Sequence, residues 1–424
     1  MPGQLGVLRG SALYVGALIG PGLLLVPALA VEAAGAASIV AWAGLLVLSA
    51  PLAITFAALG VRHPVAGGVS AYVRAGLGDT AAAVTGGWFV GAMLLGGPTV
   101  SLIGGRYVAD LTGSGTAVAA AVGLVMFATV LTANALGLRV SSGFQLVLSS
   151  VLIGVMAVAI VAALPSRADD NWTPFAPHGW WAVGTAANLL IWLFVGWEAV
   201  AQLVGDFRRP SRDLPRAMAL AFALVTVVYV GLAVATIGVT AGTSSSVPLA
   251  DLVSVGFGEI GRDATAVLAV ALTMGTMNVY LGGAAKLMAA LSGEVLPRWF
   301  GEGRPRTIPL RPLALLAVVG VALLAGLAAG LSTTDDLIRA TSALFIAVYV
   351  LAIVSAIRIL DGRVRGAAIA ALVLVVALAV FSAAFLVVPL ALAGVALLAR
   401  RVLRPEGAAA APSRLAPPCP HASD

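Results

Sequence analysis

The stretch Leu18–Leu23, with the sequence LIGPGL, interrupts the first of many long apolar runs in the chain. Proline lacks an amide hydrogen and clashes with the preceding helical turn, and glycine weakens a helix further. A second interruption, Leu193–Glu198 (LFVGWE), places a glycine beside a carboxylate at a similar depth in another apolar run. The sequence therefore predicts two helices that unwind near their middles.

The composition places these helices in a membrane. Of 424 residues, 61% are hydrophobic and only 10% are charged, against roughly 25% charged in an ordinary soluble domain. Apolar runs of about 20 residues, each long enough to cross ~30 Å of hydrocarbon, recur from Ser11 to Leu398. The first run is longer than a signal-peptide core of about 7–15 residues, so we expect it to be retained. The predicted fold class is an all-α integral membrane protein with twelve transmembrane helices, at 11–34, 36–60, 80–104, 116–137, 141–164, 182–204, 215–240, 262–291, 311–330, 335–357, 365–382 and 384–401.

The two interrupted helices each begin a group of five. We therefore expect one transmembrane domain over residues 1–404, with repeats at about 11–164 and 182–357, an extra hairpin at 365–401 and a disordered cytoplasmic tail at 405–424. Glycine and proline are also common in membrane helices for packing and kinking alone. Their pairing at corresponding positions of two repeats favours a functional role over a purely structural one, since inverted-repeat transporters form their site where two broken helices meet.

Basic residues sort by side of the membrane. Of 24 Lys and Arg residues, the predicted outer segments hold only Arg106, Arg167, Arg262 and Arg339. This positive-inside bias predicts that both termini are cytoplasmic, in the cell membrane. It also explains the high pI of about 10.1 without a nucleic-acid partner. The single cysteine, Cys419, excludes disulfides and Cys-based metal sites, and we expect no cofactor.

Three stretches resemble the signatures of the amino acid/polyamine/organocation superfamily. Ile19–Ala30 is similar to its broken first helix, and Pro64–Gly68 with Tyr72 matches its P-x-x-G-G-x-x-x-Y segment. Phe194–Glu198, continued by Arg209–Ala217, is similar to its F-x-G-x-E and N-P-x-R-x-[IL]-P-x-A motifs. The resemblance covers nearly the whole chain and implies the five-plus-five inverted repeat of the leucine-transporter (LeuT) type.

A finer likeness points to the exporters of methionine and branched-chain amino acids, through Arg62–Val69 and the Val84–Gly86 start of the third helix. By this resemblance the first break binds an amino acid's carboxylate through N–H groups, and the second binds its ammonium through carbonyl groups. Trp197 or Phe194 is expected to close over the substrate's side chain. The implied substrate-binding residues are Ile19, Gly20, Gly22, Leu23, Phe194, Val195, Gly196, Trp197, Gly97, Asn278 and Thr341.

One position departs from the family pattern. Pro21 replaces the usual serine or threonine, so a hydroxyl and an N–H group are both missing there. The carboxylate site must then rely more on Gly22 and Leu23.

Glu198 is the one acidic residue expected near the membrane centre, where a carboxylate costs roughly 2.5–3.5 kcal/mol on insertion scales. It is a candidate for proton coupling. It could equally act as a structural cap that accepts hydrogen bonds from N–H groups freed by the break. The two roles are compatible, and the sequence leaves them open.

The expected function is export of neutral apolar amino acids. Three stretches predicted to face the site, Met93–Thr99, Thr273–Tyr280 and Thr341–Phe345, contain no charged residue, and a charged side chain buried without a partner is strongly unfavourable. The alternatives are an uptake permease or exchanger and, in a different class, a non-transporting membrane scaffold. No H-E-x-x-H or G-x-S-x-G motif supports an enzyme, and the oligomeric state is not readable from the sequence.

Overall fold

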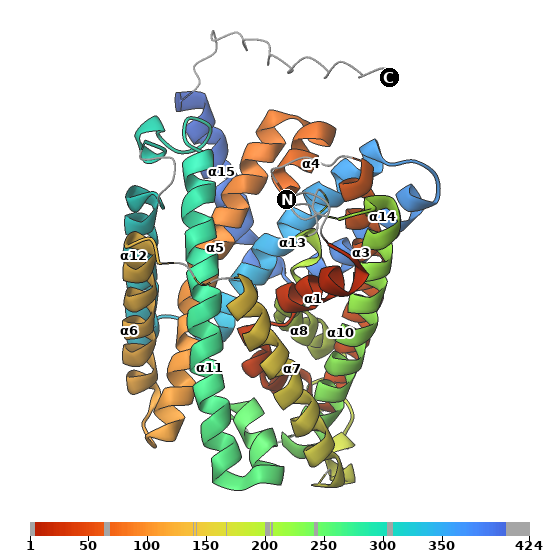
Figure 1. Ribbon diagram of the computed structural model, residues 1–424, viewed down its shortest axis with the longest axis vertical. Coiled ribbons are helices and arrows are strands. Elements are labelled where there is room, and N and C mark those ends of the chain that lie inside the picture. The colour runs from red at the N-terminus through yellow and green to blue at the C-terminus, as the bar shows by residue number, and fades with distance from the viewer. Residues whose placement is uncertain are drawn as a thin grey trace.

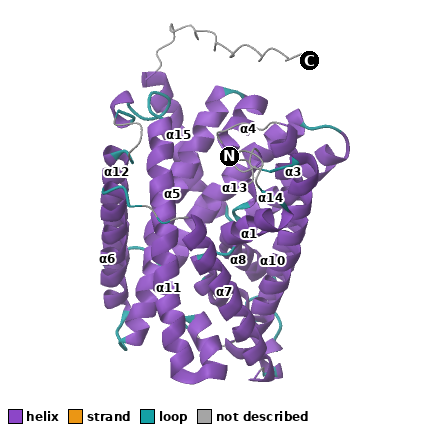
Figure 2. Cartoon of the chain, in the orientation of Figure 1, coloured by secondary structure: helices purple, strands orange, loops and turns teal. Residues whose placement is uncertain are grey.

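The computed structural model describes residues 5–62, 68–138, 140, 142–166, 168–199, 204, 207–240, 245–302 and 308–403. Within these ranges the regular structure is helical (Figure 2), and the only β-pairings are isolated bridges, Leu5 with Phe207 and Ser292 with Leu296. The all-α fold class is confirmed. The predicted tail at 405–424 lies outside the described residues.

The α-helices are α1 (Val7–Leu18), α2 (Val26–Ala34), α3 (Ser38–Arg62), α4 (Gly68–Leu77), α5 (Asp79–Leu111), α6 (Thr116–Ala135), α7 (Ser142–Ala163), α8 (Trp181–Leu190), α10 (Pro210–Thr240), α11 (Pro248–Ala290), α12 (Leu310–Ala328), α13 (Thr334–Ile359), α14 (Gly362–Val380) and α15 (Val387–Leu403). Short 3-10 segments lie between several of them. Those at the two interruptions are η1 (Pro21–Leu24), η5 (Ile191–Phe194) and η6 (Trp197–Ala199).

The described part of the chain contains ten helical stretches that are long and apolar enough to cross a membrane. These are Val26–Arg62, Asp79–Leu111, Thr116–Ala135, Gly143–Ser166, Pro210–Val239, Pro248–Ala290, Leu310–Ala328, Thr334–Ile359, Gly362–Val380 and Ala383–Leu403. Two shorter apolar helices, Val7–Leu18 and Trp181–Phe194, adjoin the predicted breaks. The chain is therefore a multi-span membrane protein.

Most helices run roughly along the long axis of the bundle (Figure 1). Helix α5 contacts α6, α11 and α13, while α6 and α12 pack together at one edge and α14 packs on α3 at the other. The α5–α6 packing is close because of two glycines. A β-carbon at Gly105 would lie 2.1 Å from the Ala119 carbonyl oxygen, and one at Gly123 would lie 3.2 Å from the Ser101 carbonyl oxygen. Small residues of this kind let membrane helices approach backbone to backbone.

Two segments differ from the sequence-based prediction. Residues 61–79 lie between two predicted spans with no helix predicted there, but residues 68–77 form α4, because Val69, Tyr72 and Val73 together give this short segment a buried apolar face. At ten residues, or about 15 Å, it is too short to span the bilayer. Helix α11 begins at Pro248, well before the predicted start at 262, and it bends at Gly258, where φ is +58°. We refer below to the end of the bundle that carries α4 as the α4 end.

Candidate functional site

The first interruption is where the sequence predicts it. Helix α1 ends with the Ile19 N–H bonded to the Val15 carbonyl at 2.8 Å, and Gly20 is extended (φ −131°, ψ −175°). Pro21 then opens η1, a first helical position where its missing N–H removes no hydrogen bond. The Leu23 N–H, one of the predicted carboxylate donors, bonds within this turn to the Gly20 carbonyl at 3.1 Å.

The second interruption separates η5 from η6. Val195 is extended (φ −78°, ψ 132°) and Gly196 has φ +140°, a conformation that favours glycine. A β-carbon at Gly196 would also lie 3.1 Å from the Ala17 carbonyl oxygen, and one at Gly22 would lie 2.6 Å from Leu193 Cδ2. The two broken helices therefore pack directly against each other.

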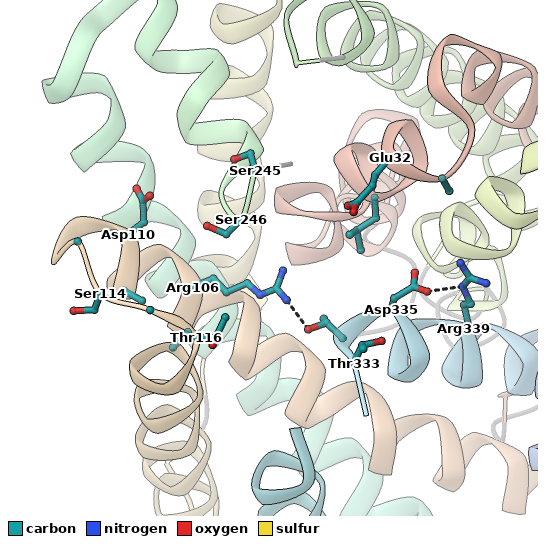
Figure 3. Close-up of a pocket in the computed structure, with 17 residues that line it drawn as sticks. Glu32, Arg106, Asp110, Ser114, Thr116, Ser245, Ser246, Thr333, Asp335 and Arg339 are labelled. Carbon is teal, nitrogen blue, oxygen red and sulfur yellow. Dashed lines mark hydrogen bonds and ion pairs between the residues drawn. The ribbon is translucent and has the colours of Figure 1, made fainter. Parts of the chain in front are cut away.

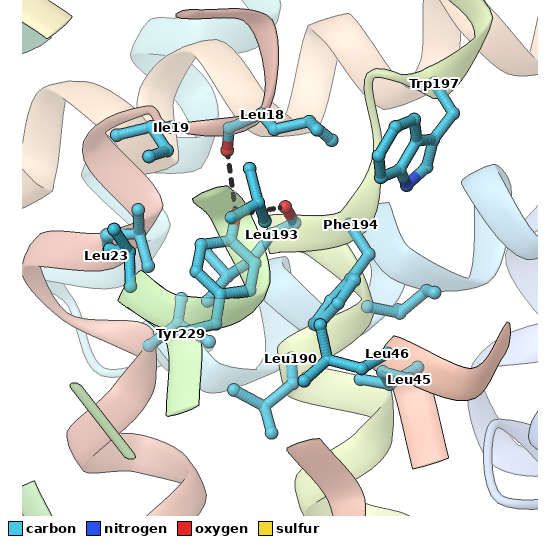
Figure 4. Close-up of a cluster of buried hydrophobic side chains, with 14 of the residues drawn as sticks. Leu18, Ile19, Leu23, Leu45, Leu46, Leu190, Leu193, Phe194, Trp197 and Tyr229 are labelled. Carbon is cyan, nitrogen blue, oxygen red and sulfur yellow. Dashed lines mark hydrogen bonds between the residues drawn. The ribbon is translucent and has the colours of Figure 1, made fainter. Parts of the chain in front are cut away.

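Two buried tyrosines satisfy carbonyl groups that the interruptions leave free. The Tyr229 hydroxyl on α10 lies 3.0 Å from the Leu18 carbonyl oxygen and 2.8 Å from that of Leu193, so it joins both breaks (Figure 4). The Tyr107 hydroxyl on α5 donates to the Leu24 carbonyl at 2.8 Å. Sequence reasoning missed both residues. Their signal is a phenol within an otherwise apolar helix, since a buried tyrosine usually finds a partner for its hydroxyl.

The Glu198 carboxylate accepts two hydrogen bonds at one oxygen. The Gly196 N–H donates to Oε2 at 3.0 Å, and the Tyr349 hydroxyl of α13 donates to the same atom at 2.7 Å. The first contact is the kind that a structural cap makes, because it occupies an N–H freed by the break. Tyr349, whose ring packs on Phe56 at 5.8 Å, was not singled out from the sequence.

A cavity of about 510 Å³ lies against both interruptions, within the usual size range of ligand sites. It extends from the breaks to the first residues of α4. Among the described residues that line it, Glu198 is the one that carries a charge. The lining residues are Ala17, Leu18, Gly20, Pro21, Gly22, Gly68, Val69, Ser70, Phe89, Met93, Val100, Trp192, Leu193, Val195, Gly196, Glu198, Thr276, Val279, Tyr280, Gly283, Leu287 and Phe345.

Five of the predicted site residues line this cavity together: Gly20, Gly22, Val195, Gly196 and Glu198. The three stretches predicted to face the site also contribute to its wall. Met93 comes from the first, Thr276, Val279 and Tyr280 from the second, and Phe345 from the third.

The remaining predicted residues of the two breaks lie behind the cavity wall. Ile19 and Leu23 are fully buried in the core. The Phe194 ring packs edge-on against Tyr229 at 5.1 Å, and the Trp197 indole N–H lies 3.3 Å from the Ser49 hydroxyl. Neither ring lines the cavity.

Three predicted site residues on other helices do not line this cavity and make packing or hydrogen-bond contacts elsewhere. A β-carbon at Gly97 would meet Leu281 Cδ2 at 3.0 Å, and the Thr341 hydroxyl donates to the Leu337 carbonyl. Asn278 accepts from the Val140 N–H at 2.8 Å and donates to the Leu138 carbonyl at 3.1 Å. It therefore ties α11 to the α6–α7 connection and lines an adjoining cavity beside α1 and α7, which shares Ala17, Thr276 and Val279 with the first.

Two broken helices that meet at a cavity inside a bundle of membrane-spanning helices define a class of membrane transporter. Comparisons with known proteins name the family. A sequence profile of the amino acid permease family matches residues 5–400, and the chain belongs to that family. Its relatives are permeases and transporters, not enzymes.

Three relatives illustrate the range of the family. The chain is 32% identical over 363 residues to YecA of Bacillus subtilis, an uncharacterized amino acid permease, covering 84% of this chain and 85% of that protein. It is 29% identical over 372 residues to YjeH of Escherichia coli, an L-methionine/branched-chain amino acid exporter, covering 85% and 87%. It is 26% identical over 315 residues to the vacuolar cationic amino acid transporter 8 of Arabidopsis thaliana, covering 70% and 53%.

Proposed function

We propose that this permease is a secondary active transporter that exports neutral apolar amino acids, among them methionine, leucine, isoleucine and valine, in exchange for protons. The observation that carries the proposal is the cavity between the two breaks. It brings backbone groups of Gly20, Gly22, Val195 and Gly196 to one space. Exposed N–H and C=O groups near helix ends suit the carboxylate and ammonium that all amino acids share.

The proposed architecture is one transmembrane domain over residues 1–404 with twelve spans. The two broken helices count as spans one and six. Repeats over about 11–164 and 182–357 would each begin with a broken helix, and the hairpin at 365–401 would follow as an addition. The meeting of the two breaks through Gly22, Leu193, Ala17 and Gly196 supports a five-plus-five inverted repeat of the LeuT type.

The proposed orientation puts the α4 end in the cytoplasm, with both termini, in the cell membrane. Arginine side chains gather at that end. Arg62 pairs with Asp361, Arg74 with Glu294 and Arg311 with Glu302, while Arg400 bonds the Asp79 carbonyl. Such an excess of arginine marks a cytoplasmic face. The substrate cavity, which reaches α4, would then face inward.

The substrate class follows from the side chains around the breaks. Phe89, Met93, Val100, Trp192 and Phe345 line the cavity, and burial of an apolar side chain there gains roughly 0.8 kcal/mol per CH₂. The name of the Escherichia coli relative, an exporter of methionine and branched-chain amino acids, supports the same substrates and direction. We propose that Gly20 and Gly22 hold the carboxylate and that the Val195 carbonyl accepts from the ammonium.

Glu198 is the proposed proton carrier. Its carboxylate lines the cavity and also accepts from Gly196, so a change in its protonation would alter both the charge of the site and the cap on the break. The proton-coupling and capping roles then belong to one mechanism.

Two alternative functions differ from export in what they would do with an amino acid. An uptake permease or exchanger would use the same cavity with the opposite net flux, and a non-transporting scaffold would not exchange amino acid at all. The vacuolar cationic relative makes lysine the informative competitor, because Glu198 could serve as a counter-charge for a cationic side chain.

Counterflow in proteoliposomes tests the proposal. Vesicles preloaded with unlabelled leucine should accumulate labelled leucine, and excess methionine should compete while excess lysine should not. If none of the twenty amino acids gave counterflow, the result would favour the non-transporting scaffold. Direction needs cells: those fed leucyl dipeptides should release free leucine faster when they carry the protein, whereas unchanged release together with robust leucine uptake would favour the permease.

A further inference from the structure

Another cavity, of about 860 Å³, lies at the end of the bundle opposite α4. It is larger than the substrate cavity and its wall carries charges of both signs (Figure 3). The lining residues are Leu29, Glu32, Ala33, Arg106, Ala109, Asp110, Gly113, Ser114, Gly115, Thr116, Ala119, Ser245, Ser246, Thr333, Thr334, Asp335 and Arg339. We call this space the vestibule.

Most charged side chains around the vestibule are already paired. Arg339 lies 2.8 Å from Asp335. Asp110 lies 2.8 Å from Arg262, which also contacts Asp251 at 2.7 Å. Arg339 compensates Asp335, whereas Asp110 and Asp251 share Arg262 and leave one negative charge, but each of these groups already has a partner.

Glu32 and Arg106 differ from these pairs. Arg106 on α5 donates to the Thr334 hydroxyl at 2.7 Å, and no carboxylate of the described chain lies within 4.0 Å of it. Glu32 on α2 forms no ion pair with any described residue, and its side chain is exposed to the vestibule. Figure 3 shows the two side chains reaching into the same space from opposite walls.

We propose that the vestibule is a second binding site for a zwitterionic amino acid, on the far side of the membrane from the α4 end. Arg106 would hold the carboxylate and Glu32 the ammonium. A ligand that carries both charges can bridge two fixed groups that are too far apart to pair with each other, and guanidinium–carboxylate hydrogen bonds are charge-assisted. Leu29, Ala33 and Ala109 supply an apolar wall for the side chain.

The identity of the ligand rests on the proposed transport of neutral amino acids, but the site itself is separate. Substrate that leaves the substrate cavity toward the far side of the membrane would pass the vestibule before reaching bulk water. Because the vestibule is open to solvent, its charges are partly screened, and the site should be weak. A weak site suits release, since tight binding there would slow export.

The test is a fluorescence titration at the vestibule itself. Ser246, which is exposed and lines the vestibule, is changed to cysteine in a Cys419→Ser background and labelled with an environment-sensitive dye. Leucine should change the fluorescence at millimolar concentration. Leucinamide, which lacks the carboxylate, and 4-methylpentanoate, which lacks the ammonium, should each need at least about ten times more.

Substitutions distinguish specific contacts with the ligand from general electrostatic attraction by the vestibule. Arg106→Gln and Glu32→Gln should each weaken the leucine response about tenfold, and Arg106→Lys should restore part of it. Arg339→Gln removes the same charge from the same vestibule but from a guanidinium already paired with Asp335, so it should change the response less than about threefold. Equal effects of Arg106→Gln and Arg339→Gln would show that the vestibule attracts leucine only by its overall charge, and would contradict a specific site.

The outcomes distinguish this proposal from the transport proposal. Normal leucine counterflow with no dye response, or with equal responses to the three ligands, would overturn the vestibule site alone. A failed counterflow assay would overturn the transport proposal, and the titration, repeated with all twenty amino acids, would still read the vestibule directly. A response that requires both the carboxylate and the ammonium and is lost in both Gln variants would support the site.

Discussion

The Tyr349 hydroxyl donates a 2.7 Å hydrogen bond to the Glu198 carboxylate across 151 residues of sequence. It thereby links α13 to the second break, at the oxygen that also accepts from the Gly196 N–H. Protonation of this carboxylate would weaken both contacts, since a neutral carboxyl is a poorer acceptor. A single proton could therefore loosen the break from α13.

This link predicts two different effects on the pH dependence of transport. Glu198→Gln should flatten the pH profile of leucine counterflow while leucine binding survives. Tyr349→Phe should keep a pH-dependent rate, because Glu198 remains, but with a profile shifted from wild type, because the carboxylate loses one of its two donors at Oε2. A wild-type profile in Glu198→Gln would remove this residue from coupling, and loss of folded protein would instead favour the cap.

The Gly196 backbone predicts a sharp contrast between two glycine substitutions. Gly196→Ala should destabilise the protein by about 1–3 kcal/mol, because φ is +140° and such strain has that cost. The new β-carbon would also crowd the Ala17 carbonyl. Gly20→Ala is the matched control, since Gly20 has φ −131° and a β-carbon added there would have no neighbouring atom within 4 Å. Thermal unfolding in detergent measures both, and equal melting temperatures would contradict the strain argument.

The shared hydroxyl of Tyr229 predicts a structural role at both breaks. The single hydroxyl proton of Tyr229 is shared between the Leu18 and Leu193 carbonyls, so Tyr229→Phe removes one donor from this pair, and an unsatisfied buried polar group costs about 1–3 kcal/mol. Tyr14→Phe is the control. Tyr14 is equally buried, but its hydroxyl has no hydrogen-bond partner among the described residues. We expect a lower melting temperature and slower transport for Tyr229→Phe only. Similar losses in both variants would point to general packing.

The proposed orientation predicts which positions an impermeant maleimide can reach in intact cells. In a Cys419→Ser background, single cysteines at Asp170 and Ser245 should react from outside. Cysteines at Ser211 and Asp361 should react only after the membrane is permeabilised. External labelling of the second pair in sealed cells would reverse the topology.

The positions of the two breaks were predictable because their causes are local. Proline and glycine act on the backbone of their own turn, so Leu18–Leu23 and Leu193–Glu198 can be read without knowing the fold. The membrane class was equally predictable, since composition over 424 residues is a bulk property. Helix α4 was missed because a short amphipathic segment among glycines lacks the long apolar run that identifies a span.

What surrounds the breaks was decided by tertiary structure alone. Tyr229 and Tyr349 act on atoms contributed by distant segments of the chain, and no local pattern marks which buried hydroxyl will meet which carbonyl. The same holds for Phe194 and Trp197, which adjoin the second break yet turn away from the cavity. The direction in which each of these side chains points depends on the unwound backbone and on the helices packed behind it. The sequence by itself determined that this protein spans the membrane with two interrupted helices; only the packing of those helices decided which groups share a cavity, because burial and hydrogen bonding are properties of the assembled bundle.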